Sequence, residues 1–313
     1  MWRYLDKAKQ LFTQQIEEWE LARTNYKQLA GVKAREFLFE GFKVKVQFNP
    51  GRIISSSAKV DKKSIAGRAC FLCAKNRPKE QRGVESGDYE ILVNPFPIFP
   101  GHFTIPRKKH LPQLIMPYFG DMLELSRGIP GFTVFYNGPE CGASAPDHFH
   151  FQAVGEEFMP INNEIGVLKK RGGGSILVLG QPCRVVDDGL RKFFVLEGSS
   201  KEMLKRQFAH IINAMGKLHP NGGGEPMLNV LSNFNNDAWR VLIFPRGKHR
   251  PWQYFEEGGK NILLSPASVD MGGVLITPLE KDFKKISRED IRDIFHQVLL
   301  PEDEFNALTR FIQ

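Results

Sequence analysis

The spacing of apolar residues changes several times along the chain, and each spacing predicts a different element. Over residues 2–29 apolar side chains recur about every 3.6 residues, which predicts one amphipathic helix. Residues 37–48 alternate apolar and polar positions up to an Asn-Pro-Gly turn, which predicts a strand. Residues 89–97 and 102–106 predict two strands joined by a Pro/Gly turn, and a helix is expected over residues 114–128.

Short strands and helices alternate in the rest of the chain as well. Apolar runs predict strands over residues 132–136, 175–179, 192–196, 227–233 and 239–244. A helix is expected over residues 201–218, with Ser199 or Ser200 as its N-cap. Another helix is expected from Ser287, where Ser-Arg-Glu-Asp is a capping box. This mixture of elements favours an α+β fold.

One stretch, residues 137–152, combines a loop rich in Gly, Ser and Pro with two histidines and a glutamine that alternate with phenylalanines. Successive side chains of a strand point to opposite faces, so His148, His150 and Gln152 are expected on one face. The two phenylalanines between them then point into the core. An exposed polar face is the simpler explanation of alternating histidines. The complete set, preceded by small residues whose N–H groups could hold an anion, favours a functional site.

The composition is that of an ordinary globular protein with an excess of positive charge. The 313 residues, 42% of them hydrophobic, are enough for two domains or for two halves of one. The net charge of +8 favours an anionic partner, and a small phosphorylated ligand fits it as well as nucleic acid does. Because there is no signal-like segment and no run of about 18 apolar residues, we expect a cytoplasmic protein without a membrane partner.

Four cysteines, Cys70, Cys73, Cys141 and Cys183, are too few for a disulfide framework in a chain of this length. Cys70-Phe-Leu-Cys73 is a C-x-x-C pair, which is typical of a redox pair or of half a metal site. No thioredoxin-like βαβ pattern surrounds it, so half a zinc site is favoured, with histidines as the other ligands. The candidates are His102, His110, His148, His150, His210, His219, His249 and His296.

A motif of the form P-R-x-K-H-x-P occurs twice, at residues 106–112 and 245–251, each time after an apolar strand. We interpret it as the mark of a duplicated α+β unit, which divides the chain into residues 1–164 and 165–313. No His-x-His-x-Gln follows the second copy, so a single site is expected. For His249 a structural role and a role in the pocket both stay open.

The segment from Arg52 to Lys59 carries these two cations and three consecutive serines. A solvated loop and an arm that binds phosphate explain it equally well.

Asn137, the Gly-Ala-Ser run that begins at Gly142 and the His-x-His-x-Gln at residues 148–152 resemble the histidine triad superfamily. They are most similar to its larger branch of galactose-1-phosphate uridylyltransferases, diadenosine tetraphosphate phosphorylases and GDP-L-galactose phosphorylases. Residues 94–106 and 265–276 resemble the GDP-hexose phosphorylases in particular. The resemblance implies two histidine-triad-like halves, with antiparallel sheets flanked by helices, that form one pseudo-symmetric unit. Dimerisation is common in this family, so a homodimer is a further expectation.

The resemblance also implies a role for each site residue. His150 would attack the α-phosphorus of a nucleotide and carry the nucleotidyl group as a covalent intermediate, and Gln152 would donate a hydrogen bond to a phosphoryl oxygen. His148 would bind metal or position the motif. Other groups would bind the phosphates: Asn137, Gly142, Ala143 and Ser144 around the reacting phosphorus, and Arg52 and Lys59 at the distal phosphate.

The C-x-x-C resembles that of the uridylyltransferases and implies a structural zinc held by Cys70, Cys73, His110 and His148. Phe149, which stands where the uridylyltransferases have proline, and Asp147 are more similar to the phosphorylases. We therefore expect a nucleotidyltransferase or phosphorylase that splits an NDP-sugar or a dinucleoside polyphosphate with phosphate. A hexose 1-phosphate acceptor, a hydrolase, and a nucleotide- or RNA-binding protein without turnover are the alternatives. The intact motif argues against a mere binder, and nucleic acid is not the expected partner.

Overall fold

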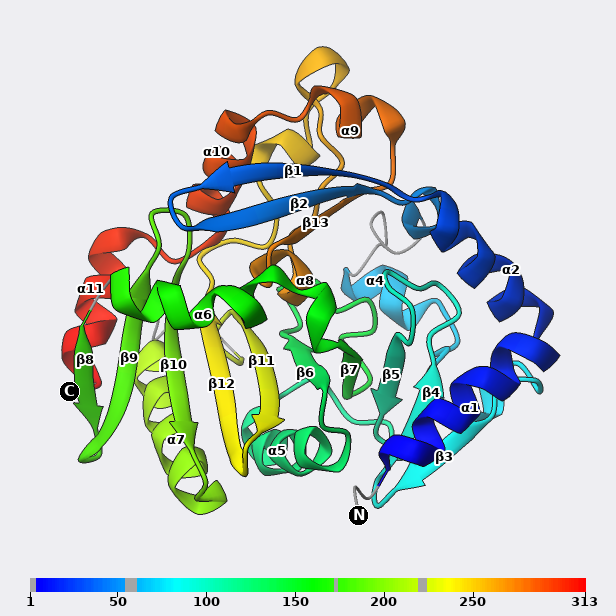
Figure 1. Ribbon diagram of the computed structural model, residues 1–313, viewed down its shortest axis with the longest axis horizontal. Helices are drawn as coiled ribbons and strands as arrows, with labels where there is room; N and C mark the ends of the chain where they lie inside the picture. Colours follow the sequence, from blue (N-terminus) through cyan, green and yellow to red (C-terminus); the bar gives the residue numbers. More distant parts are fainter. Residues whose placement is uncertain (1–3, 54–60, 172–173, 219–223) are drawn as a thin grey trace.

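The computed structural model describes residues 4–53, 61–171, 174–218 and 224–313, and its centre is a ten-stranded sheet (Figure 1). The first five strands along the chain are β3 (Gly83–Ser86), β4 (Tyr89–Val93), β5 (Phe103–Pro106), β6 (Phe132–Asn137) and β7 (His150–Gly155). The other five are β8 (Ser175–Val178), β9 (Gln181–Asp187), β10 (Lys192–Gly198), β11 (Leu228–Asn235) and β12 (Ala238–Pro245). Across the sheet the order is β3-β4-β5-β7-β6-β11-β12-β10-β9-β8, and neighbouring strands are antiparallel.

The two sets of five strands have the same order from the outer edge of the sheet to its middle. In each set a helix joins the third strand to the fourth: α5 (Phe119–Gly128) follows β5, and α7 (Lys201–Leu218) follows β10. The sets meet at β6 and β11, where Asn137 lies opposite Asn229. The α+β architecture of antiparallel strands flanked by helices is therefore confirmed. The expected boundary after residue 164 falls inside α6 (Pro160–Arg171) and stays a prediction.

The two P-R-x-K-H-x-P motifs do not occupy equivalent places in the two sets. One follows β5, a third strand, and the other follows β12, a fifth strand, so our interpretation of the motif as the mark of the duplication is wrong. Because alternate strands of an antiparallel sheet run in the same direction, β5 and β12 point the same way. Both motifs therefore leave the sheet at the end where β7 begins, beside residues 137–152.

Helices and a second sheet cover the two faces of the large sheet. One core packs α1 (Leu5–Glu18), α5, α7 and α11 (Glu302–Phe311) against the first face. The other packs α6, α10 (Arg288–Val298) and the second sheet against the opposite face. Phe151 of β7 belongs to the first core, so His150 and Gln152, its neighbours in the strand, point to the second face.

The second sheet has three strands, β1 (Lys33–Phe39), β2 (Phe42–Phe48) and β13 (Val274–Thr277). The prediction of one strand over residues 37–48 is wrong, because the chain turns at Gly41, which has a φ of +80° that favours glycine, and β1 and β2 form a hairpin. β13 pairs with β2 in parallel, so a C-terminal segment lies beside an N-terminal one (Figure 1).

The single helix expected over residues 2–29 is broken at Trp19, whose backbone is extended and whose side chain is buried; α2 (Glu20–Gln28) follows the break. The helix expected from residue 114 begins as α5 only after a 3₁₀ turn at Met116–Tyr118. α10 starts with the predicted capping box of Ser287 and Asp290. The remaining α-helices are α4 (Lys62–Ala66), α8 (Ser268–Met271) and α9 (Glu280–Lys285). No helix in the described part of the chain is both long and apolar enough to cross a membrane.

A buried ion pair ties the second set of strands to α8. Arg191 is fully buried; its Nε donates to Asp188 Oδ2 at 2.8 Å, and its Nη1 donates to the carbonyl oxygen of Met271 at 3.0 Å. Its guanidinium also lies 4.6 Å above the ring of Phe42 in β2. Replacing the arginine leaves a buried carboxylate without its cation, which destabilises a protein by about 3–5 kcal/mol.

We therefore predict that Arg191→Met lowers the free energy of unfolding by about 3 kcal/mol or more, measured by urea denaturation. Lys205→Met is the control, because Lys205 forms an exposed pair with Glu202 and should change the free energy of unfolding by less than about 1 kcal/mol. Equal effects of the two substitutions would contradict the importance of the buried pair.

Candidate active site

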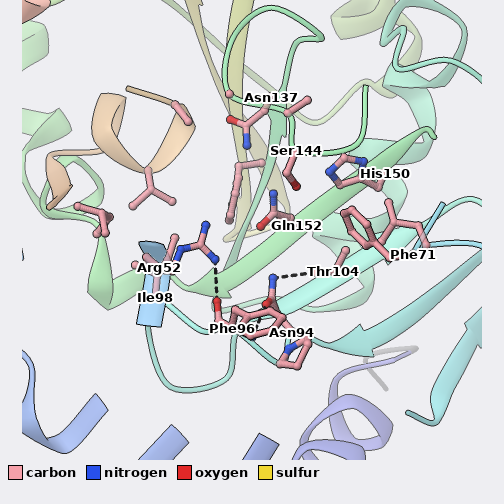
Figure 2. A pocket seen from close by; sticks show the side chains of 18 of the residues that line it. Arg52, Phe71, Asn94, Phe96, Ile98, Thr104, Asn137, Ser144, His150 and Gln152 are labelled. Atoms are coloured by element: carbon pink, nitrogen blue, oxygen red, sulfur yellow. Dashed lines mark hydrogen bonds between the residues drawn. The ribbon is translucent and has the colours of Figure 1, made fainter. Parts of the chain in front are cut away.

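A cavity of about 490 Å³ opens at the end of the large sheet where β7 begins. His150 and Gln152 of β7 lie on its wall together with Asn137, at the end of β6, and Ser144 of the loop between β6 and β7 (Figure 2). Further walls come from the second sheet, from the segment before β13 and from residues that follow β12. The cavity is therefore built by both sets of strands.

The His150 side chain is uncharged and has a defined tautomer. Its Nδ1 lies 2.8 Å from the carbonyl oxygen of His148, which can only accept a hydrogen bond, so Nδ1 carries the proton. Nε2 consequently keeps its lone pair. Burial lowers the pKa of His150 to about 4, so the ring is neutral at pH 7. A neutral imidazole with an open Nε2 at a cavity wall is suited to nucleophilic attack.

Gln113, which no sequence pattern singles out, holds the backbone of His150 in place. Its side chain is buried and accepts a hydrogen bond from His150 N at 2.8 Å through Oε1. Through Nε2 it donates to the carbonyl oxygens of His150, at 2.9 Å, and of Asn137, at 3.1 Å. The side-chain amide of Gln113 thus takes the place of backbone hydrogen bonds where β6 ends and β7 begins.

His102 orients Gln152. The amide of Ile98 donates to His102 Nδ1 at 3.3 Å, so the ring proton is on Nε2, which lies 2.9 Å from Gln152 Oε1. Burial, with a smaller effect from Arg52, lowers the pKa of His102 to about 3, so the ring is uncharged. With its oxygen engaged, the Gln152 amide has its NH₂ group left to donate to a ligand. In the sequence His102 was only one of eight possible metal ligands.

The loop before β7 approaches the second half of the chain closely. Asn137 Oδ1 accepts hydrogen bonds from Asn229 Nδ2 at 3.0 Å and from the Ser268 amide at 2.8 Å. Gly142 has a φ of +96°, and a Cβ built on it would lie 2.4 Å from the Cβ of Ala267, so only glycine fits. Gly142, Ala143 and Ser144 all line the cavity, as an anion-binding loop requires.

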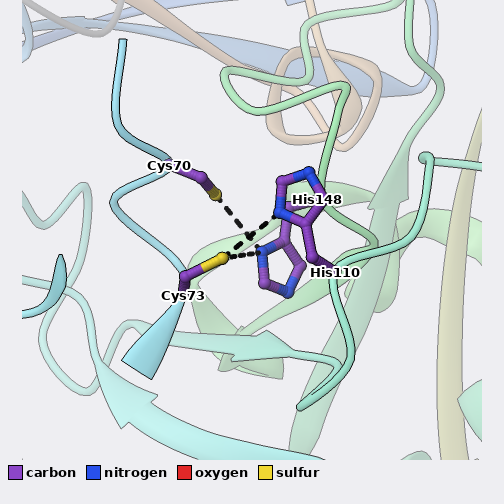
Figure 3. Close-up of side chains that lie close together, drawn as sticks. All are labelled: Cys70, Cys73, His110 and His148. Atoms are coloured by element: carbon purple, nitrogen blue, oxygen red, sulfur yellow. Dashed lines mark hydrogen bonds between the residues drawn. The ribbon is translucent and has the colours of Figure 1, made fainter. Parts of the chain in front are cut away.

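His148 is not on the face predicted for it. β7 starts only at His150, and the His148 amide closes a turn onto the Ala145 carbonyl at 3.1 Å, so the strand alternation does not extend to His148. Its ring points instead to the cysteines (Figure 3). The prediction that His148 shares a face with His150 and Gln152 is therefore wrong.

The structure brings Cys70, Cys73, His110 and His148 together, with one ligand atom of each within 4.8 Å of the others (Figure 3). The Cys70 Sγ and His148 Nδ1 atoms are 3.2 Å apart, as are Cys73 Sγ and His110 Nδ1. His148 Nε2 donates to the Arg107 carbonyl at 2.7 Å, which leaves Nδ1 as a lone pair directed at the sulfurs. Two thiols and two imidazoles at these separations suit a tetrahedral zinc ion.

Of the two cations predicted to bind the distal phosphate, only Arg52 lies among the described residues. Arg52 lines the cavity and donates from Nη1 to the Phe96 carbonyl at 2.7 Å, and burial lowers its pKa to about 10, so it remains charged (Figure 2). Lys59 lies outside the described residues. His249 lines the cavity, together with Arg250.

Two family models match separate parts of the chain. Residues 11–155 match a family described as a domain of unknown function (DUF4922), and residues 185–313 match the family described as GDPGP1-like, C-terminal domain. No curated protein matched the chain in sequence.

Solved structures of a yeast enzyme share the fold. Free yeast Ap4A phosphorylase Apa2 is 17% identical with a TM-score of 0.54, over 90% of this chain and 95% of that one. Its complex with AMP is 16% identical with a TM-score of 0.58, over 93% and 96% of the two chains. Its complex with Ap4A is 16% identical with a TM-score of 0.57, over 93% and 97%.

The chain therefore has the fold of yeast Ap4A phosphorylase Apa2, with a His-x-His-x-Gln motif at the end of its central sheet. Within this chain, residues 185–313 are similar to the GDPGP1-like C-terminal domain.

Gln113 generates a prediction about this site. Gln113→Leu leaves the amide and carbonyl of His150 buried without partners, so we expect the free energy of unfolding to fall by about 1–3 kcal/mol in urea denaturation. Gln10→Leu, at an exposed position of α1, is the control and should change it by no more than about 0.5 kcal/mol. A Gln113 variant as stable as the control would show that the amide does not hold His150.

Proposed function

We propose that the protein transfers a nucleotidyl group through His150, and that it does so by phosphorolysis of an NDP-sugar or a dinucleoside polyphosphate. The observation that carries this proposal is the neutral His150 ring, with its Nδ1–H bound to the His148 carbonyl and its Nε2 left open at the cavity. A GDPGP1-like C-terminal domain and the fold of an Ap4A phosphorylase support it.

The reaction proceeds in two displacements. In the first, the Nε2 lone pair forms a bond to the α-phosphorus while the bond from that phosphorus to the bridging oxygen breaks, which releases a sugar 1-phosphate or the remaining nucleotide. The positive charge that the ring gains is shared with the His148 carbonyl through the Nδ1 proton. In the second, an oxygen of inorganic phosphate attacks the same phosphorus, Nε2 leaves, and a nucleoside diphosphate forms.

The groups around His150 suit the charge that develops on the phosphoryl oxygens. The Gln152 NH₂ group, fixed by His102, and the Asn137 amide, fixed by Asn229, are preoriented donors. Figure 2 shows the side chains of Asn137, Ser144 and Gln152 gathered near His150. Because these donors are held before a ligand binds, little reorganisation is needed in the transition state.

An apolar part of the cavity wall is suited to a nucleobase. Phe71, Leu72, Pro95 and Phe96 supply apolar and aromatic surface, and the Asn94 side chain lies among them. Flat aromatic surface with a few polar groups is typical of a site for a nucleoside. Phe71 and Leu72 belong to the Cys70–Cys73 loop, so the metal cluster also shapes this wall.

We propose that the four-ligand cluster holds a structural zinc ion. When bound, zinc would join the Cys70–Cys73 loop to the turn that carries His148, and it would have no open position for catalysis. Asp147 Oδ2 lies 3.6 Å from His110 Nε2, so the cluster also has the carboxylate that commonly orients a histidine ligand.

A hexose 1-phosphate acceptor, as in the uridylyltransferases, is the second candidate, and the Cys/His cluster is the observation that favours it. The choice of phosphate over a sugar phosphate, a cytoplasmic location and a homodimer all stay predictions.

His150→Ala should abolish turnover. We expect the wild-type protein, screened on NDP-sugars and dinucleoside polyphosphates with phosphate, to release a nucleoside diphosphate and to show ping-pong kinetics. The variant should lose at least about a thousandfold in rate and form no nucleotidyl-protein detectable by intact-mass spectrometry. His296→Ala, at an exposed position of α10, is the control. An unchanged rate in His150→Ala would overturn the mechanism.

Release of nucleoside monophosphate, with or without phosphate, would instead indicate a hydrolase. Consumption of the NDP-sugar only when a hexose 1-phosphate is present would indicate the uridylyltransferase reaction.

The zinc proposal predicts about one zinc ion per chain in the purified protein, by mass spectrometry of dissolved metal, and a loss of that zinc in Cys70→Ser. Cys183→Ser is the matched control, because Cys183 is buried in β9, outside the cluster. Equal zinc content in the two variants would contradict the assignment.

A further inference from the structure

The segment after β12 contributes His249 and Arg250 to the cavity wall, and the chemistry proposed for His150 leaves both without a role. They come from the second set of strands, which carries no His-x-His-x-Gln of its own. In the sequence, His249 was equally compatible with a structural role and with a role in the pocket.

Arg246 holds this segment rigidly. Its buried guanidinium donates from Nη2 to the carbonyl oxygens of Lys248, at 3.1 Å, and His249, at 3.3 Å. It also donates from Nε to the Val298 carbonyl at 2.8 Å and from Nη1 to the Pro266 carbonyl at 3.0 Å. The backbone of His249 is thereby fixed to the end of α10 and to the segment before α8.

Two connections place the His249–Arg250 segment beside the loop expected to bind the reacting phosphate. In the first, Arg246 Nη1 donates to Asn229 Oδ1 at 2.5 Å, and Asn229 Nδ2 donates to Asn137 Oδ1 at 3.0 Å. In the second, Arg250 Nε donates to Ser265 Oγ at 3.0 Å, two residues from the Ala267 that Gly142 touches. The segment is thus adjacent to the loop, on the side of the second half of the chain.

The charge of this region suits a phosphate. The described residues that line the cavity include three arginines, Arg52, Arg68 and Arg250, but only one carboxylate, that of Asp270. Burial and the neighbouring arginines lower the pKa of His249 to about 4, so its ring is neutral and can donate one hydrogen bond without adding charge. The Arg250 guanidinium also stacks over Tyr254 at 4.1 Å, which limits its movement.

We propose that His249 and Arg250 bind the phosphoryl group next to the reacting phosphorus. That group is the β-phosphate of the donor in the first displacement and inorganic phosphate in the second. Both displacements occur opposite Nε2 of His150, so the leaving oxygen and the entering oxygen occupy the same position. This inference rests on the proposed function. It assigns to the second half of the chain the selection of phosphate, rather than water, as acceptor.

Equilibrium binding tests the proposal without turnover. We expect isothermal titration calorimetry of the full chain with GMP and GDP, and with AMP and ADP, to show tighter binding of the diphosphate for the base that the protein accepts. Arg250→Met, which keeps a long side chain over Tyr254, should weaken diphosphate binding about tenfold or more and monophosphate binding less than about twofold. Arg240→Met, within β12 and paired with Glu197, should change neither.

His249→Ala should show the same pattern with a smaller loss, and Arg250→Lys should restore part of the diphosphate affinity. In turnover with phosphate, Arg250→Met should raise KM for phosphate about tenfold and increase the proportion of nucleoside monophosphate among the products. Thermal melting of each variant identifies any that fails to fold, and the other substitution then provides the test.

Equal loss of monophosphate and diphosphate affinity in the folded Arg250 and His249 variants, or no loss of either, would overturn the proposal. Such a result leaves the role of His150 intact, since that role is tested by His150→Ala. Conversely, an active His150→Ala protein would overturn the proposed mechanism. The difference between diphosphate and monophosphate binding would still test whether His249 and Arg250 bind the second phosphate.

Discussion

The hydrogen bond from His150 Nδ1 to the carbonyl oxygen of His148 is the interaction on which the site depends. It determines which ring nitrogen of His150 faces the cavity, and it links that ring to the turn that carries His148 of the Cys/His cluster. The two histidines can have these different tasks because the chain turns before β7 and sends the His148 ring toward the cysteines. Gln113 completes the arrangement, since its single amide satisfies the backbone of His150 where no strand is available to do so.

The junction of β6 and β11 explains how a duplicated architecture makes one site. Each set places its fourth strand at the middle of the sheet, and β6 and β11 run in opposite directions, so the end of β6 lies beside the start of β11. At the end that carries residues 137–152, the first set supplies His150 and the second supplies Asn229, Arg246 and the segment after them. The hydrogen bond from Asn229 Nδ2 to Asn137 Oδ1 holds the residues of the two sets in position relative to each other. The second set therefore supports the chemistry of the first.

Local patterns predicted much of the site. Alternation placed His150 and Gln152 on one face of a strand, and most strands of the large sheet and the long helix α7 were visible as apolar runs. The resemblance, not the spacing, selected the histidines of the Cys/His cluster. Sequence could not show that the strand begins at His150, since its start depends on Gln113, far away in the chain. The same holds for His102, whose partner Gln152 is 50 residues distant, and for β13, whose pairing with β2 has no local signal.

The pairing of β2 with β13 has a consequence for the order in which the molecule is assembled. Thr277 Oγ1 donates to the Gln47 carbonyl across a separation of 230 residues, and Ile276 of the same strand lines the cavity. During synthesis the cysteine loop and the His-x-His-x-Gln strand leave the ribosome well before that wall exists. Contacts so distant in sequence form late, because the entropy of closing the intervening chain must be overcome first. The nascent chain thus has His150 before it has a closed pocket to place it in.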